Sequence, residues 1–122
     1  MLSLRTANAR PTGSQLETEF LQLIRPVAAI PEPERQRPVV RHGEIVARLD
    51  FAFPDVWAYT EVHGAQHRES LRYDAYRETT VAATLGWLES EVTAGDVRNT
   101  PRPTVARMIE FLATAARRLP GQ

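Results

Sequence analysis

A ten-residue segment, residues 44–53, constrains the fold of this chain more than any other feature of its sequence. Apolar side chains occupy every second position of the segment, at Ile45, Ala47, Leu49, Phe51 and Phe53. A period of two is typical of a strand that buries one face and exposes the other. The segment therefore predicts a half-buried strand, with Asp50 on its less apolar face.

Turn residues on both sides of this strand predict that it pairs with its neighbours in the sequence. His42-Gly43 separates it from an extended run over residues 37–41, which is a hairpin signal. Pro54-Asp55 follows it and leads into residues 56–62, which we interpret as a third strand antiparallel to the second.

Apolar periodicity elsewhere predicts helices on both sides of these strands. Before the strands we expect a first helix over residues 14–27, with a Ser14–Glu17 capping box, and a connector at 30–34. After them we expect a helix over 68–85 ended by Gly86, a fourth strand over 87–92 and a loop or single turn over 93–98. A last helix runs through Val105, Met108, Leu112 and Ala116. The helical crossover makes the fourth strand parallel to the third or to a neighbour. The order α-β-β-β-α-β-α predicts an α/β (α+β) fold, a four-stranded mixed sheet flanked by helices. We expect one domain over residues 14–118 after a loose lead-in over 1–13.

Composition excludes several classes of chemistry. The chain has no cysteine, so disulfides, thiolate metal sites and cysteine nucleophiles are ruled out. Fifteen basic residues, all arginine, balance fifteen acidic ones, so no lysine amine serves catalysis and net charge indicates no partner. No apolar run approaches the roughly 20 residues that cross a bilayer, and the N-terminus lacks a signal-peptide pattern, so we expect a cytoplasmic protein without a membrane partner.

Two acidic residues are expected to converge between the second and third strands. If Pro54-Asp55 forms a two-residue hairpin, Asp50 opposes Tyr59 and Glu61 opposes Arg48. Asp50 and Glu61 then lie diagonally on one face, about 7–8 Å apart between backbones. A hard divalent cation would relieve the repulsion between them. The alternative is an ordinary solvated strand face on which Arg48 pairs with both acids.

Other polar residues near this pair are candidates for the same site. Glu17 on the first helix could supply a third acid, although capping explains it as well. His63 and His67 could act as a general base, a water-orienting group or metal ligands, or be ordinary loop residues. Three arginines of the crossover helix could contact phosphates or be surface charge: Arg68, Arg72 and Arg77.

An ordered set of short motifs connects these candidates with a known family. The set comprises Leu16-Glu17-Thr18, Ile30-Pro31-Glu32-Pro33 with Gln36-Arg37-Pro38-Val39, Val46-Ala47-Arg48-Leu49-Asp50-Phe51-Ala52, Glu61-Val62-His63-Gly64 with Gln66-His67-Arg68, Asp74 to Arg77, Leu85-Gly86-Trp87, and Val92-Thr93 with Asp96-Val97. Over roughly residues 14 to 116 the chain resembles the small domains related to very-short-patch-repair endonucleases. That family belongs to the PD-(D/E)XK, or restriction-endonuclease-like, superfamily.

The resemblance implies a magnesium- or manganese-dependent DNA endonuclease. Asp50 and Glu61 would match the two acids of the superfamily motif, the carbonyl of Val62 would complete the metal shell, and Glu17 would match the helix acid. His63 stands where the superfamily has its lysine. Magnesium would bind a phosphate oxygen, activate water and stabilise the departing oxygen, while His63 and His67 orient water or the leaving group.

Two departures from the family pattern keep other functions open. Relatives usually have an aspartate at the position of His63 and a basic residue near Glu91. The alternative function is a catalytically inactive nuclease-fold module that binds nucleic acid or a protein partner. A third is a homodimeric interaction domain that uses Trp57, Tyr59 and the last helix. Because relatives often carry a preceding winged-helix region, we expect a partner protein or a missing N-terminal DNA-binding domain to assist DNA binding.

Overall fold

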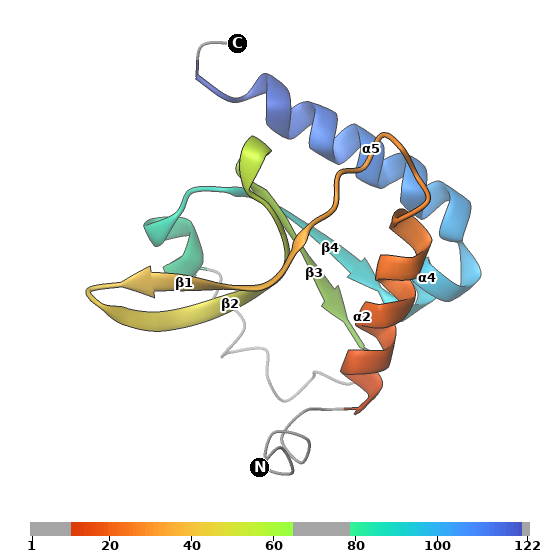
Figure 1. Ribbon diagram of the computed structural model, residues 1–122, viewed down its shortest axis with the longest axis horizontal. Helices are drawn as coiled ribbons and strands as arrows, with labels where there is room; N and C mark the ends of the chain where they lie inside the picture. Colours follow the sequence, from red (N-terminus) through yellow and green to blue (C-terminus); the bar gives the residue numbers. More distant parts are fainter. Residues whose placement is uncertain (1–10, 65–78, 121–122) are drawn as a thin grey trace.

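The computed structural model describes residues 11–64 and 79–120. Four strands form one mixed sheet in the order β1-β2-β3-β4, so an α/β architecture with a four-stranded mixed sheet is confirmed. Figure 1 shows α2, α4 and α5 grouped around β3 and β4, away from the tip of the β1–β2 hairpin. In the described part of the chain, no helix is both long enough and apolar enough to cross a membrane.

Helix α2 spans Pro11–Ile24 and packs the N-terminal part of the chain onto the sheet. It begins at Pro11 rather than at Ser14, so the predicted capping role of Ser14 is wrong. Proline is favoured at the first position of a helix, because its missing N–H would have no helical partner there and its φ angle is already helical. The helix ends before Pro26, and the proline-containing connector follows as expected.

Strands β1 (Glu34–Arg41) and β2 (Glu44–Phe53) form the predicted antiparallel hairpin. Its two turn residues, His42 and Gly43, have φ angles of 53° and 80°, the left-handed values that a tight hairpin turn requires. The register shifts by one residue between Val39 and Val40. This irregularity changes which residue of β1 lies opposite each residue of the inner half of β2.

The connection from β2 to β3 (Ala58–His63) is longer than the predicted two-residue turn. A 3-10 helix, η1 (Pro54–Val56), and Trp57 in the left-handed conformation fill it, so Phe53 pairs with Ala58 instead of Val56. The predicted register, with Asp50 opposite Tyr59 and Glu61 opposite Arg48, is therefore wrong by two residues. A shift of two keeps the same faces, because side chains alternate with a period of two.

Strand β4 (Leu88–Thr93) pairs with β3 in the predicted parallel orientation. Residues 79–84 are helical, and Gly86 follows with a φ angle of 70°, as expected for a glycine that ends a helix. The earlier part of the crossover helix expected over 68–85 lies outside the described residues.

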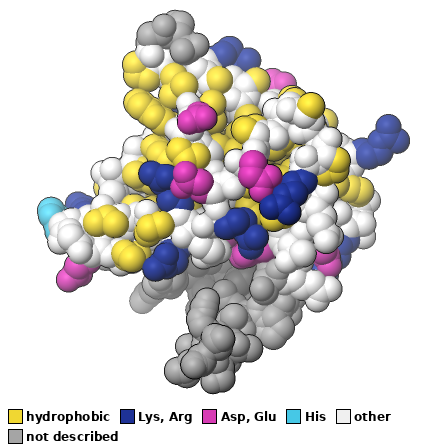
Figure 2. Space-filling model, viewed as in Figure 1, with side chains coloured by type: hydrophobic (Ala, Val, Ile, Leu, Met, Phe, Trp, Pro, Cys, Tyr) yellow, Lys and Arg dark blue, Asp and Glu magenta, His cyan; other side chains and the backbone are white. Residues whose placement is uncertain are grey.

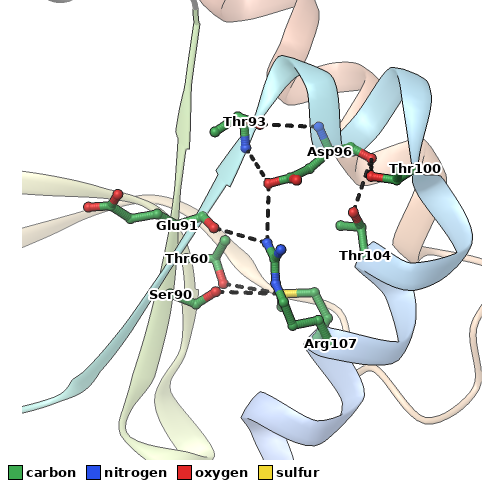
Figure 3. Close-up of polar contacts among 9 residues, drawn as sticks. Thr60, Ser90, Glu91, Thr93, Asp96, Thr100, Thr104 and Arg107 are labelled. Atoms are coloured by element: carbon green, nitrogen blue, oxygen red, sulfur yellow. Dashed lines mark hydrogen bonds and ion pairs between the residues drawn. The ribbon is translucent and has the colours of Figure 1, made fainter.

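A loop or single turn was expected over residues 93–98, but the structure has a short helix there, α4 (Ala94–Asn99). Thr93 caps it: the Thr93 side chain accepts a hydrogen bond from Asp96 N at 3.1 Å, and the Asp96 carboxylate accepts one from Thr93 N at 2.9 Å (Figure 3). This reciprocal arrangement is a capping box, whose Thr-x-x-Asp spacing is visible in the sequence. The last helix, α5 (Pro101–Arg117), follows directly.

Two apolar cores lie on opposite sides of the sheet. The larger joins α2, α4 and α5 to one face, with Phe20 of α2 edge-on to Phe51 at 5.0 Å between ring centroids. The smaller contains Val39, Leu49, Ala52, Tyr59 and Val81. Because both faces are covered, Ala52 is as buried as Phe51, although the alternation in the sequence predicts an exposed position for Ala52.

Candidate active site

Strand β2 lacks regular backbone pairing on both sides at Asp50. On the β1 side, pairing is recorded at Arg35–Phe51 and Arg37–Leu49, and Gln36 between them has a φ angle of 54°. On the β3 side, the described register ends at Phe51–Thr60. A non-glycine residue with positive φ inside a strand is uncommon and kinks the chain. Asp50 therefore lies at a bend where backbone groups need other partners.

Two carboxylates supply those partners. The Glu61 carboxylate accepts a hydrogen bond from Asp50 N at 3.0 Å, and the Asp50 carboxylate accepts one from Val62 N at 2.9 Å. If the β2–β3 register continued by one residue, Asp50 would lie directly opposite Glu61. The structure thus brings the two predicted acids to neighbouring positions through these hydrogen bonds, and not through the predicted diagonal of a regular ladder.

Glu61 is almost fully buried, with 3% of its surface exposed, whereas Asp50 is half-buried. A buried charged group is costly unless hydrogen bonds or an opposite charge stabilise it. The bond from the Asp50 amide supplies part of that stabilisation, and it ties the carboxylate to the adjacent strand.

Gln36 is a third member of the cluster that sequence reasoning missed. Its side-chain amide lies 3.4 Å from Oδ1 of Asp50, and its backbone carbonyl accepts a hydrogen bond from Arg48 at 3.5 Å. The His42-Gly43 turn alone would place Gln36 opposite Leu49. Only the register shift at Val39 and Val40 places it opposite Asp50, so the sequence carries no clear signal for this contact.

His63 lies two residues after Glu61 on β3, so both side chains are on the same face. Its Nε2 is 3.7 Å from Oε2 of Glu91, and Glu91 is the β4 residue paired with Glu61. Glu91 therefore lies beside His63, the one predicted site histidine among the described residues. When His63 is protonated, this contact is an ion pair.

Glu17 is placed differently from the strand acids. Its carboxylate accepts a hydrogen bond from Arg35 at 3.1 Å, and the Arg35 guanidinium lies 4.8 Å from the centroid of the Phe51 ring. Glu17 projects from α2, on the side of the larger core, whereas Glu61 shares a face of β3 with Tyr59 of the smaller core. Within residues 11–64 and 79–120, no three His, Asp or Glu side chains form a group able to hold a metal ion.

The donors at the β2–β3 bend nevertheless suit a hard divalent cation, because such ions prefer carboxylate and carbonyl oxygens. Asp50 and Glu61 supply two carboxylates. The N–H of Val62 donates to Asp50 on β2. Because the N–H and C=O of one strand residue point toward the same neighbouring strand, the carbonyl of Val62 is directed to β2 as well. These three residues are the ones that could hold a metal ion.

Four further predicted site residues lie outside the described residues: His67, Arg68, Arg72 and Arg77.

The end of β4 next to this cluster is held by a polar network (Figure 3). Arg107 of α5 donates to the carbonyl oxygen of Glu91 and to the Asp96 carboxylate, both at 3.2 Å. The hydrogen bond from the Thr93 backbone, aided by Arg107, holds the pKa of Asp96 below its usual range in spite of partial burial. The network fixes the backbone at Glu91, and with it the strand that lies beside Glu61 and His63.

Ion pairs between neighbouring side chains occupy many arginines of the described surface. Arg25 pairs with Glu32, and Arg37 pairs with Glu34, each at 2.7 Å. On the face seen in Figure 2, acidic and basic side chains lie next to one another. Such local neutralisation weakens long-range attraction to a polyanion.

Comparisons of this chain with protein-family models, with curated proteins and with solved structures find no match.

Proposed function

We propose that this chain is a metal-dependent DNA endonuclease, or nuclease-like phosphodiester hydrolase, with a restriction-endonuclease-like core, acting in the cytoplasm. The observation that carries the proposal is a pair of hydrogen bonds at the bend of β2, in which the Glu61 carboxylate accepts from Asp50 N and the Asp50 carboxylate accepts from Val62 N. It holds two carboxylates together at a place where the backbone ladder is open. Oxygen donors gathered in this way suit magnesium or manganese.

Each residue of the cluster would have a distinct role in hydrolysis. Asp50, Glu61 and the Val62 carbonyl would hold the metal ion, and Gln36 would orient the Asp50 carboxylate through Oδ1. A metal ion bound there supplies Lewis-acid stabilisation of phosphate charge and a more acidic water. His63 would orient water or the leaving oxygen, and its Nε2 lies 3.7 Å from Oε2 of Glu91.

The proposal is tested by nicking of supercoiled plasmid DNA with magnesium or manganese. Asp50→Asn keeps an oxygen that can accept the hydrogen bond from Val62 N, so it removes the charge with little change of shape. We expect its nicking rate to fall by at least about 10- to 100-fold, the loss typical of weakened metal sites. Glu110→Gln, an exposed substitution of the same type on α5, is the matched control and should leave the rate unchanged. Equal rates for wild type and Asp50→Asn would reject the metal-binding assignment.

A second candidate is a catalytically inactive nuclease-fold module that binds nucleic acid or a protein partner. The same two hydrogen bonds favour it, because the carboxylates satisfy backbone N–H groups at the bend and so have a structural role without any metal. This candidate predicts no nicking with either metal. If DNA is the partner, its binding should weaken steeply as salt concentration rises.

A further inference from the structure

A second site lies at the other end of β3 from the acidic pair. A cavity of about 190 Å³ is lined by Trp57 and Leu88, by Ala115 of α5, and by Arg118 and Leu119 directly after that helix. Figure 1 shows η1, the helix that precedes Trp57, beside the C-terminal half of α5. The cavity is smaller than the 300–1,000 Å³ typical of drug-sized ligands, which suits one planar ring system.

Trp57 is held at this cavity in an unusual conformation. Its φ and ψ angles are 55° and 51°, and left-handed values are strained for a bulky side chain. Two backbone hydrogen bonds impose them: Trp57 N donates to Pro54 O at 3.2 Å, and Leu88 N donates to Trp57 O at 3.0 Å. Even so, Trp57 remains 49% exposed. The fold therefore fixes a large aromatic residue at the surface instead of burying it, and strain of this kind concentrates at ligand sites.

Arg118 adds a positive charge to the same cavity. It is exposed, and the structure records no ion pair between it and an acidic side chain of the described residues. Two arginines elsewhere on the surface, the exposed Arg25 and the half-buried Arg37, have acidic neighbours at 2.7 Å. The cavity therefore combines an anion-binding group, the Arg118 guanidinium, with a stacking surface, the ring of Trp57.

We propose that this cavity binds one nucleotide of a single-stranded nucleic acid, with the base stacked on Trp57 and a phosphate at Arg118. Bases of every type stack on aromatic side chains, and arginine binds phosphate. Any anion with an aromatic ring has the chemistry that this cavity would recognise, and we choose a nucleotide because the proposed function is DNA hydrolysis. Trp57 immediately precedes β3, and the cavity lies on the side of the larger core with Leu88 and Ala115. Glu61 shares a face of β3 with Tyr59 of the smaller core, so binding of a nucleotide at the cavity does not require contact with the acidic pair.

The distribution of exposed apolar residues argues against a second copy of this chain as the occupant. A stable interface buries about 800 Å² of each partner. Among the described residues, the other large exposed apolar side chains lie apart from it: Val40 and Ile45 at the hairpin tip, and Ile109 on α5. Trp57 is thus the one large exposed apolar side chain of the described residues that lines this cavity, and the volume of the cavity is that of a small ligand.

The test measures binding without metal, so that it is independent of cleavage. In Trp87→Phe protein, Trp57 is the single tryptophan, and its fluorescence reports binding of a single-stranded DNA of about ten nucleotides in EDTA. Quenching is expected, and duplex DNA of the same sequence should bind more weakly. For the Trp57 variants, affinity is measured by anisotropy of the labelled DNA. Trp57→Gly accepts the left-handed backbone and should weaken binding about 5- to 150-fold, while Trp57→Tyr should retain most of the affinity.

The charge contribution is tested separately on the surface of α5. Arg118→Gln should weaken binding and reduce its salt dependence, whereas Arg102→Gln, an exposed arginine elsewhere on the helix, should do neither. Unchanged affinity in both Trp57→Gly and Arg118→Gln would overturn the inference. So would a concentration-dependent dimer that Trp57→Gly dissociates, since a second copy would then occupy the cavity. Wild-type protein that binds DNA through Trp57 but nicks none would refute the proposed function alone, whereas protein that nicks DNA while both variants keep full affinity would refute this inference alone.

Discussion

The capping box at the start of α4 provides a quantitative test of the structure through Asp96. Its carboxylate accepts hydrogen bonds from Thr93 N at 2.9 Å and from Arg107 at 3.2 Å. Asp96→Asn keeps the size of the side chain but removes the charge from both bonds. Charged hydrogen bonds stabilise more than neutral ones, and exposed ion pairs add at most about 1 kcal/mol, so we expect a loss of about 1 kcal/mol at neutral pH.

This loss can be converted into a melting temperature. Unfolding entropy of about 2.1 cal/mol/K per residue gives roughly 0.26 kcal/mol/K for 122 residues, so 1 kcal/mol corresponds to about 4 °C. Asp96→Ala also removes the capping bond, which contributes about 0.5–2 kcal/mol, so the total loss of roughly 1.5–3 kcal/mol should lower the melting temperature by about 6–12 °C. Calorimetry of both variants beside Glu110→Gln, whose exposed side chain should contribute less than about 0.5 kcal/mol, provides the measurement and its control.

The pH dependence gives the decisive result. The pKa of Asp96 is lowered in the folded protein from its ordinary value of 3.8, mainly by the hydrogen bond from the Thr93 backbone. A lowered pKa in the folded state stabilises fully above the unfolded-state pKa, and this contribution is lost as pH falls through the folded-state pKa. The difference between wild type and Asp96→Asn should therefore be constant near neutral pH and shrink below a pH of about 4. A difference that does not shrink in acid would refute the assigned role of the carboxylate.

Two further stability predictions follow from burial and backbone conformation. Phe51→Ala should destabilise the protein by about 3–5 kcal/mol in denaturant titrations, because the ring is fully buried against Phe20. Ile45→Ala, at a 53% exposed position of the same strand, is the control and should change stability by less than about 1 kcal/mol. Equal losses of stability in the two variants would contradict the two-core packing. Gly86→Ala should lower stability by about 1–2 kcal/mol, since alanine is strained at a φ angle of 70°, and an unchanged melting temperature would contradict the left-handed end of the crossover helix.

The sequence by itself determined the local elements of this fold. The strand over residues 44–53, the His42-Gly43 turn and the position of Gly86 each depend on neighbours in the chain, and each was confirmed. The predicted single buried face of that strand is wrong, because Leu49 packs in the smaller core and Phe51 in the larger one. The parallel pairing of β4 with β3 followed from a helical crossover between them. Even α4, which was missed, has its signal in the Thr93-x-x-Asp96 spacing. Local hydrogen bonds and side-chain periods are properties of short segments, and a sequence records them directly.

Only the tertiary structure decided how the strands align and therefore which side chains meet. The hydrogen bond from Asp50 N to Glu61 formed with two additional residues in the β2–β3 connection, and the contact of Asp50 with Gln36 required a register shift in the other hairpin. Neither change alters composition or period. Burial of Glu61 and Ala52 likewise depended on a second helical layer that the alternation of one strand does not reveal. Register and burial are set by packing between segments that are distant in the sequence. The sequence could therefore identify Asp50 and Glu61 as candidates, but their geometry depends on how the sheet is assembled.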